Sequence, residues 1–247
     1  MKVIALYNIK GGVGKTASAV NLAYCAAKSG ARTLLWDLDP QGASSFYFRI
    51  KPTIKGGLKP LMGSNDKLLQ NIKATDYENL DLLPADLSLR HFELALNETK
   101  GSRKRLRKIL EPFLDTYDFI FLDCPPNLTL LTENIIRAAN VILCPVIPTT
   151  LSERTLSQLR QFLEEEQSST RLLPFFSMAE KRKSLQTEIM DDLPHSAGPF
   201  LKTVIPYLSD VERMGIHREP VAVTKYASRA AKAYSELFAE LNEALKE

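Results

Sequence analysis

The chain has 247 residues with a formal net charge of +3, and its 45% hydrophobic and 25% charged content is ordinary for a globular protein. No run of about 18 or more apolar residues occurs, which excludes a membrane-spanning helix, and the amino terminus lacks a signal-peptide pattern. Cys25, Cys124 and Cys144 are too few and too scattered for a disulfide framework or a zinc site, so we expect a protein of the reducing cytoplasm.

The first predicted elements are a strand over Val3–Tyr7 and a helix over Ala17–Lys28, joined by a glycine-rich turn. Such a turn places backbone N–H groups at a helix N-terminus, where the helix dipole favours anions and glycines let phosphate approach closely. Lys15 can then reach the β- and γ-phosphates of ATP, and the Thr16 hydroxyl can bind Mg²⁺. An ordinary glycine-rich turn is the alternative. The predicted phosphate-binding residues are Gly11, Gly12, Val13, Gly14, Lys15, Thr16 and Ala17.

This turn departs from the common pattern G-x-x-x-x-G-K-[ST], because Ile9 stands where glycine is expected and a second lysine, Lys10, opens the loop. The run from Lys10 to Thr16 resembles the deviant Walker A motif of the ParA/MinD family of ATPases. The resemblance implies that Lys10 reaches across a homodimer, which sandwiches two ATP molecules, to the partner's phosphates. Lys10 and Lys15 would then be catalytic, since a cation arriving in this way offsets γ-phosphate charge as an arginine finger does. The alternative is that Lys10 is a solvated loop residue.

A short apolar run over Arg32–Trp36 predicts a second buried strand, which leads into Asp37, Asp39 and Pro40. Carboxylates at the carboxyl end of a parallel strand lie where doubly wound folds bind ligands. The segment resembles the D-x-D-P-Q segment of the same family. The resemblance implies that Asp39 poises the attacking water or senses Mg²⁺, and that Asp37 supports the loop. Capping of a turn before Pro40 is the alternative role for both carboxylates.

The middle of the chain is less regular. Glycines and prolines between residues 43 and 80 predict loops and small helices, and Leu80–Leu83 is a short strand candidate. Apolar residues then recur at helical spacing over Leu87–Leu114. Within that stretch, six of the nine residues from Lys100 to Lys108 are basic. They could face an anion, or they could form the solvated face of a helix.

An apolar strand over Phe119–Asp123 ends in aspartate, as a Walker B segment does. Asp123 is therefore predicted to hold Mg²⁺ through water, opposite Thr16. The Pro125-Pro126 pair that follows also resembles the family, where it starts the second switch loop. The predicted metal ligands are Thr16, Asp39 and Asp123.

Three further strands are predicted, at Val141–Val146, Leu173–Met178 and Thr203–Pro206, with a helix over Leu151–Glu166. In the family, the loops after the last two strands hold the adenine. By position, Met178, Pro206 and Tyr207 would line the base. The alternation of strands and helices predicts an α/β fold with a doubly wound, mostly parallel sheet and helices on both faces, as in P-loop NTPases. Composition is uniform, so a single domain over residues 1–247 is expected.

The resemblance extends from Lys2 to about Leu241. It implies an ATPase that dimerises on ATP, binds DNA without sequence specificity, and positions a plasmid, a chromosome or a protein complex. Hydrolysis would be slow until a ParB-like partner stimulates it, and the ATP form would associate with the nucleoid in the cytoplasm. Sequence-blind binding requires cations against phosphates rather than groups that read base edges. The predicted DNA-binding residues are Lys181, Arg182, Lys183, Arg213, Arg218, Lys225, Arg229 and Lys232. Arg229 is the strongest candidate, because Ser228–Tyr234 lines up with a family segment in which the arginine contacts DNA; solvated surface charges are the alternative.

Two other classes of function compete. A MinD-like membrane ATPase needs a basic amphipathic tail, but the tail Glu236–Glu247 is amphipathic and acidic, so we expect it to pack on the sheet and expect no membrane binding. A metabolic synthetase of the dethiobiotin or cobyrinate amide-forming type would need a substrate pocket beside the γ-phosphate. Lys10 and the run Asp37–Gln41 favour the sandwich dimer over the synthetase. A nitrogenase-type reductase is not favoured, because Cys124 and Cys144 do not match its cysteine spacing.

Overall fold

The computed structural model describes residues 1–63, 65–97, 102–113, 115–180, 182–224 and 228–246. Its strands are β1 (Lys2–Leu6), β2 (Thr33–Asp37), β3 (Lys73–Ala74), β4 (Leu80–Leu83), β5 (Phe119–Asp123), β6 (Val141–Val146) and β7 (Arg171–Phe176). Its α-helices are α1 (Lys15–Lys28), α2 (Ala43–Tyr47), α3 (Lys59–Met62), α4 (Asn65–Leu69), α5 (Phe92–Asn97), α6 (Arg105–Leu110), α7 (Leu130–Ala138), α8 (Ser152–Glu165), α9 (Ser184–Ser196), α10 (Ser209–Glu212), α11 (Met214–His217) and α12 (Ser228–Ala244). Short 3₁₀ helices lie at Leu87–His91, Ser102–Lys104 and Glu111–Phe113.

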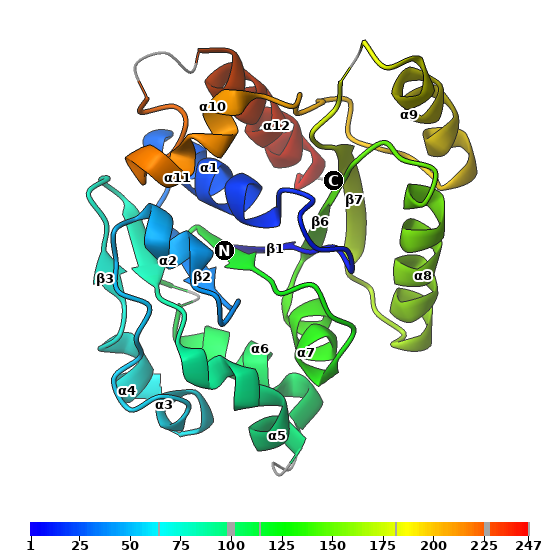
Figure 1. Cartoon of the computed structure of the whole chain (residues 1–247). Coiled ribbons are helices and arrows are strands. Elements are labelled where there is room, and N and C mark those ends of the chain that lie inside the picture. Colours follow the sequence, from blue (N-terminus) through cyan, green and yellow to red (C-terminus); the bar gives the residue numbers. More distant parts are fainter. Residues whose placement is uncertain (64, 98–101, 114, 181, 225–227, 247) are drawn as a thin grey trace.

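The strands form one sheet in the order β3-β4-β2-β5-β1-β6-β7 (Figure 1). Neighbouring strands are parallel except β3 and β4, which are antiparallel. The predicted α/β fold with a mostly parallel sheet is therefore confirmed. β1 lies between β5 and β6, so the loops that follow β1, β2 and β5 meet at the carboxyl edge of the sheet. Ligands of doubly wound folds bind at this edge.

The sheet is buried on both faces because successive side chains of a strand point to opposite sides. In β1, Val3 and Ala5 belong to one apolar cluster, while Ile4 and Leu6 belong to another. Residues of helices α3 to α9 belong to the first cluster, and residues of α1, α11 and α12 belong to the second (Figure 1). The predicted strands around β1, β2, β5 and β6 are near-continuous apolar runs, as strands buried on both faces require.

The carboxyl-terminal helix packs into the protein. Leu237, Phe238, Leu241 and Leu245 are buried in the same cluster as α1, and the Phe238 ring lies 5.8 Å from that of Phe119 in β5. This confirms the expectation that the acidic amphipathic tail packs on the sheet. Among the described residues, no helix combines the length and the apolar character needed to cross a bilayer.

The predicted strand over Thr203–Pro206 is wrong. The segment runs beside β7, and Ile205 N donates to Phe176 O at 2.8 Å, but only an isolated bridge between Ala179 and Pro206 forms. The backbone N–H groups of Lys202 and Thr203 donate to the Glu240 carboxylate, at 2.6 and 2.8 Å, instead of to β7. A side chain of α12 therefore takes the donors that a strand ladder would need.

The helical spacing over Leu87–Leu114 corresponds to short helices, not to one long helix. In the described part, α5 ends at Asn97 and α6 ends at Leu110. Pro112 follows α6, and its missing N–H ends the i to i−4 pattern there. Residues 98–101 and 114 lie outside the described ranges.

Candidate functional site

The glycine-rich loop connects β1 to α1 at the carboxyl edge of the sheet. Gly14 has φ +92°, and a Cβ at this position would lie 2.9 Å from Ser177 Oγ and 3.7 Å from Met178 Cε. Only glycine combines this left-handed backbone with so close a neighbour. No side chain among the described residues caps the start of α1, and its first turn carries no acidic residue. The amide groups at the start of α1 therefore remain available to an anion.

Two side chains hold the front of this loop. Asn8 is buried; its Nδ2 donates to Pro145 O at 2.8 Å, and its Oδ1 accepts from the Lys10 backbone N at 2.8 Å. The Lys15 side chain folds over the loop, with Nζ donating to Lys10 O at 3.0 Å and to Asn8 O at 3.3 Å. Burial lowers the pKa of the Lys15 ammonium, and the charge of Asp123 acts in the opposite direction. An anionic ligand would replace weak carbonyl partners with strong ones.

Lys10 itself is exposed at the tip of this edge. Its backbone is fixed by Asn8, but no residue in the described ranges pairs with its ammonium group. The ammonium is therefore free to reach a group outside this chain.

The two strand-end carboxylates lie next to each other. Asp123 pairs in register with Leu6 of β1 and with Asp37 of β2, and both aspartates are fully buried. Asp123 Oδ1 accepts from Thr16 Oγ1 at 3.2 Å, and its Oδ2 accepts from Ser44 Oγ at 2.8 Å. Burial raises the pKa of both carboxyl groups, and the charge of Asp123 raises that of Asp37 further. The Ser44 and Thr16 hydroxyls lower the pKa of Asp123 and thus favour its ionised form.

Asp37 and Asp39 have different surroundings. Asp37 Oδ2 accepts from the backbone N and the Oγ of Ser45, both at 2.8 Å, whereas its buried Oδ1 has no partner in the described part of the chain. Asp39 is half-buried, and its Oδ1 accepts from Gln41 N at 3.0 Å. This is the contact expected from the alternative role of Asp39, in which its carboxylate caps a turn. Its charge nevertheless raises the pKa of Asp123, as a carboxylate close to the Thr16–Asp123 pair would do.

Thr16 and Asp123 are the pair that could hold a metal ion. The described residues contain no group of three or more His, Cys, Asp or Glu side chains able to form a complete cage. Mg²⁺ rarely uses such a cage; it takes one or two protein oxygens together with phosphate oxygens and water. A hydroxyl and a carboxylate 3.2 Å apart beside a phosphate-type loop fit Mg²⁺ in this manner.

Two of the three predicted adenine residues lie beside the loop. Met178 has φ +54° and packs near Gly14, and Pro206 is held next to it by the Ala179–Pro206 bridge. Tyr207 N donates to Ala179 O at 3.0 Å, but the Tyr207 ring is 48% exposed and its hydroxyl contacts Glu212 of α10. The structure thus brings Met178 and Pro206 together and directs the Tyr207 hydroxyl elsewhere.

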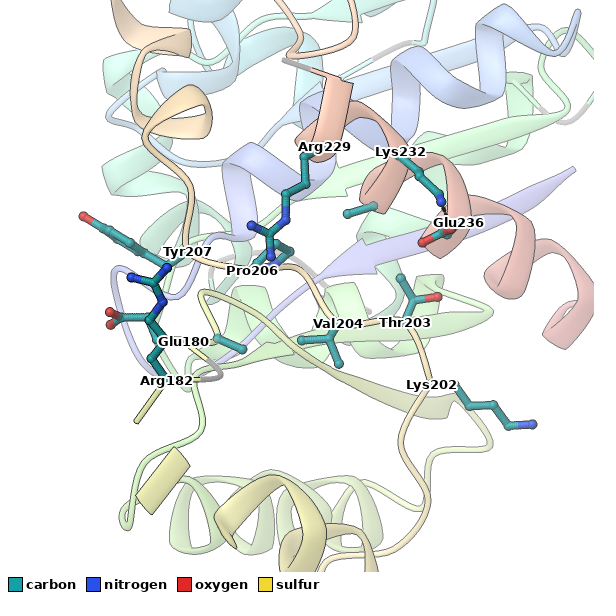
Figure 2. Close-up of a pocket in the computed structure, with 12 residues that line it drawn as sticks. Glu180, Arg182, Lys202, Thr203, Val204, Pro206, Tyr207, Arg229, Lys232 and Glu236 are labelled. Atoms are coloured by element: carbon teal, nitrogen blue, oxygen red, sulfur yellow. Dashed lines mark ion pairs between the residues drawn. The ribbon is translucent and has the colours of Figure 1, made fainter. Parts of the chain in front are cut away.

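The predicted DNA-binding residues are only partly gathered. Arg182, Arg229 and Lys232 line an open pocket of about 930 Å³, shown in Figure 2. In that view, Arg229 extends from α12 toward Pro206, and Lys232 lies beside Glu236, with which it pairs at 3.7 Å. Lys202, which is not among the predicted DNA-binding residues, lines the same pocket. The acidic side chains of Glu180 and Glu236 reduce the positive charge there.

The other predicted DNA-binding residues lie elsewhere. Lys183 pairs with Glu180, and Arg213 is exposed but does not line the pocket. Arg218 is half-buried; its Nε donates to Phe46 O at 2.9 Å, and its guanidinium lies 4.4 Å from the centre of the Phe46 ring. Lys181 and Lys225 lie outside the described residues.

The basic run before residue 109 has mixed roles. Arg103 pairs with Glu133 at 3.1 Å, and Arg105 donates to the carbonyls of Leu61 and Gly63, which joins α6 to α3. Lys104, Arg107 and Lys108 are exposed. Lys100 lies outside the described ranges. Part of this run therefore supports the fold, and the rest is a solvated basic surface.

Comparisons with known proteins agree with this geometry. Residues 1–173 match the family model described as an AAA domain. The chain is 34% identical to the sporulation initiation inhibitor protein Soj of Bacillus subtilis, over 97% of this chain and 98% of that protein. It is 32% identical to the chromosome partitioning protein ParA of Caulobacter vibrioides, over 98% and 94% of the two chains. Among solved structures, cobyrinic acid a,c-diamide synthase from Mycobacterium smegmatis, with bound ADP and magnesium, superimposes with a TM-score of 0.82 at 26% identity, covering 100% of this chain and 96% of that one.

Proposed function

Because the chain belongs to the ParA/MinD family of P-loop ATPases, we propose that it is an ATP-dependent dimer that binds DNA without sequence specificity and positions a cargo. Hydrolysis of ATP would release the dimer from DNA, and a ParB-like partner would stimulate that step. The name of the Caulobacter relative, a chromosome partitioning protein, supports the chromosome as the cargo. The protein would act in the cytoplasm and associate with the nucleoid when it holds ATP.

The carboxyl edge supplies the groups that this activity needs. The amides from Gly11 to Thr16 would hold the phosphates, and Lys15 would turn from the loop carbonyls to them. Thr16 and Asp123 would hold Mg²⁺, which when bound neutralises the charge that develops on the phosphates. Asp39 would orient the attacking water from the loop after β2, and Met178 and Pro206 would face the base.

The observation that carries the proposal is the exposed Lys10 at the front of the loop, whose ammonium group pairs with no described residue. A lysine whose backbone is fixed and whose side chain is free within the described chain is suited to act on a second copy. Two copies meeting at their carboxyl edges would each present Lys10 to the phosphates of the other. The added positive charge favours the transition state, so hydrolysis by a single chain should be slow.

Dimerisation tests this role of Lys10. The variant Lys10→Ala should bind ATP as a monomer but should not form the ATP-dependent dimer in light scattering. Lys28→Ala is the matched control, because Lys28 is also an exposed lysine but lies at the opposite end of α1 from the glycine-rich loop. A normal ATP-dependent dimer of Lys10→Ala would refute the role in trans.

Closure of the dimer would place the pockets of both chains on one DNA segment. Arg229 and Lys232 of α12 and Arg182 of the loop after β7 would then face phosphates. Paired sites raise affinity and steepen its dependence on salt. A gel-shift assay with ATP, with ADP and at rising salt should show retention only with ATP.

The variant Arg229→Glu should weaken retention equally on unrelated DNA sequences and reduce the salt slope by about 1 per chain. Lys73→Glu, a charge reversal of an exposed lysine on β3, at the opposite edge of the sheet from β7, should leave retention unchanged. If Arg229→Glu also leaves it unchanged, the DNA surface lies elsewhere, and Lys104, Arg107 and Lys108 are the next to test.

An amide-forming synthetase is the second candidate, and the likeness to cobyrinic acid a,c-diamide synthase favours it. In that case ATP turnover would depend on a small carboxylic acid and an amide nitrogen donor, not on DNA or a protein partner. ATP-dependent dimerisation and salt-sensitive DNA retention would be absent. The same two assays therefore separate the candidates.

A further inference from the structure

Helix α2 begins directly after the loop that carries Asp39, and it presents two consecutive buried serines to the strand-end carboxylates. Ser44 Oγ donates to Asp123 Oδ2 at 2.8 Å, while Ser45 binds Asp37 through both its backbone N and its hydroxyl. Both serines are fully buried. Each serine thus binds a different carboxylate: Ser44 binds Asp123, and Ser45 binds Asp37.

Ser44 is the second residue of α2, so its own helix holds no carbonyl three or four residues earlier that could accept from its hydroxyl. Here it bonds to a carboxylate 79 residues further along the chain. A buried hydroxyl and a buried carboxylate satisfy each other in this way, and a hydrogen bond to an ionised group is stronger than one between neutral groups.

The consequence for Asp123 is geometric. Ser44 holds Oδ2, and Thr16 contacts Oδ1 from the first turn of α1. No Lys or Arg in the described ranges forms an ion pair with this carboxylate, so the two hydroxyls are what fix the rotation of its plane. With Oδ2 held, Oδ1 stays directed to the Thr16 side, where the metal would lie.

We propose that Ser44 is a positioning residue for Mg²⁺, which orients the carboxylate of Asp123 from α2. This inference rests on the proposed function, because it assumes that Thr16 and Asp123 hold the metal. Loss of a group that hydrogen-bonds to a metal ligand, without touching the metal itself, commonly lowers metal affinity by about 10- to 100-fold. Because α2 follows the Asp39 loop directly, the bond from Ser44 would also connect that loop to the metal ligand Asp123.

A merely structural role gives a different result. If Ser44 only attaches α2 to the sheet, its loss lowers the melting temperature but leaves the response to Mg²⁺ unchanged. The readout must therefore report on the metal and not on folding or turnover.

The test is a fluorescence titration of the full chain with mant-ADP, first in EDTA and then at increasing Mg²⁺. For Ser44→Ala we expect nucleotide affinity in EDTA within about twofold of wild type, and a rise of about 10-fold or more in the Mg²⁺ concentration at half-effect. Thr33→Val is the matched control: it removes a buried hydroxyl at the amino end of β2, which donates to Ala31 O at 2.9 Å. Its Mg²⁺ midpoint should equal that of wild type.

A folded Ser44→Ala protein with a wild-type Mg²⁺ midpoint would overturn the inference. If Ser44→Ala does not fold, Ser44→Cys takes its place, because a thiol keeps the shape but donates weakly; an unchanged midpoint there would also overturn the inference. The proposed function fails separately, if the wild-type chain shows no Mg²⁺-dependent nucleotide binding at all.

Discussion

The glycine-rich loop yields a quantitative prediction, because two of its glycines have similar backbones and different surroundings. Gly14 has φ +92° and Gly12 has φ +72°. A Cβ on Gly14 would lie 2.9 Å from Ser177 Oγ, whereas a Cβ on Gly12 would have nothing within 4 Å. The substitution Gly14→Ala therefore adds a steric clash to the conformational cost that both glycines share.

The magnitudes follow from these two terms. A left-handed backbone costs a residue with a Cβ about 1–2 kcal/mol, and forcing an atom into packed surroundings costs about 1–3 kcal/mol more. Gly14→Ala should thus lose about 2–5 kcal/mol, which lowers the melting temperature by roughly 4–20 °C in a chain of this size. Gly12→Ala should lose only the conformational cost of about 1–2 kcal/mol, which lowers the melting temperature by roughly 2–8 °C.

The assay is thermal unfolding without nucleotide or metal, so that ligand affinity does not enter. Ser177→Ala provides the second arm of a double-mutant cycle, because it removes the Oγ that the new Cβ would meet. In the Ser177→Ala background, the cost of Gly14→Ala should fall to that of Gly12→Ala, which gives a coupling of about 1 kcal/mol or more. Equal costs for the two glycines, or the same cost of Gly14→Ala in both backgrounds, would refute the reasoning.

Three further predictions concern the charged groups of the site. Lys15→Ala should remove detectable mant-ATP binding, and retained ATP-dependent dimerisation would contradict its assignment to the phosphates. Asp39→Ala should slow ATP hydrolysis by about 100-fold or more while the ATP-bound dimer accumulates in light scattering, and unimpaired phosphate release would remove Asp39 from the mechanism. Asp37→Asn should stabilise the fold more at pH 7 than at pH 5. Burial and Asp123 raise the pKa of Asp37 above its usual 3.8, so the native protein loses stability as pH rises above about 4, and asparagine does not titrate. If the stability difference between Asp37→Asn and wild type does not change with pH, Asp37 is already ionised in the native protein and this reasoning is wrong.

The sequence predicts the framework of the site well, for a physical reason. Strands β1, β2 and β5 are apolar runs buried on both faces of the sheet. Polar or small residues, namely Asn8, Asp37 and Cys124, lie at or just after their carboxyl ends, at one edge of the sheet. Chain order and strand ends therefore suffice to bring Thr16 and Asp123 together. The carboxylate pair follows from the parallel register, which places Asp37 beside Asp123.

The errors arise where long-range side-chain contacts decide the structure. Glu240 takes the backbone donors of Lys202 and Thr203, so the apolar segment before Pro206 does not become a strand. Ser44 lies in the stretch with the weakest sequence pattern, and nothing in its neighbours predicts a bond to Asp123. Arg218 is counted as a surface cation by its type, but Phe46 engages it through a carbonyl and a ring.

The segment after β7 joins the nucleotide side of the molecule to the basic pocket. A Cβ at Gly14 would meet Ser177 and Met178, and the next residue, Ala179, forms the bridge with Pro206. Ala179 and Pro206 also line the pocket that contains Arg229 (Figure 2). A change at the loop therefore needs to pass through only a few packed residues to reach the surface proposed for DNA. The close approach of Ser177 to Gly14 thus connects the phosphate-binding loop to the surface proposed for DNA within one chain.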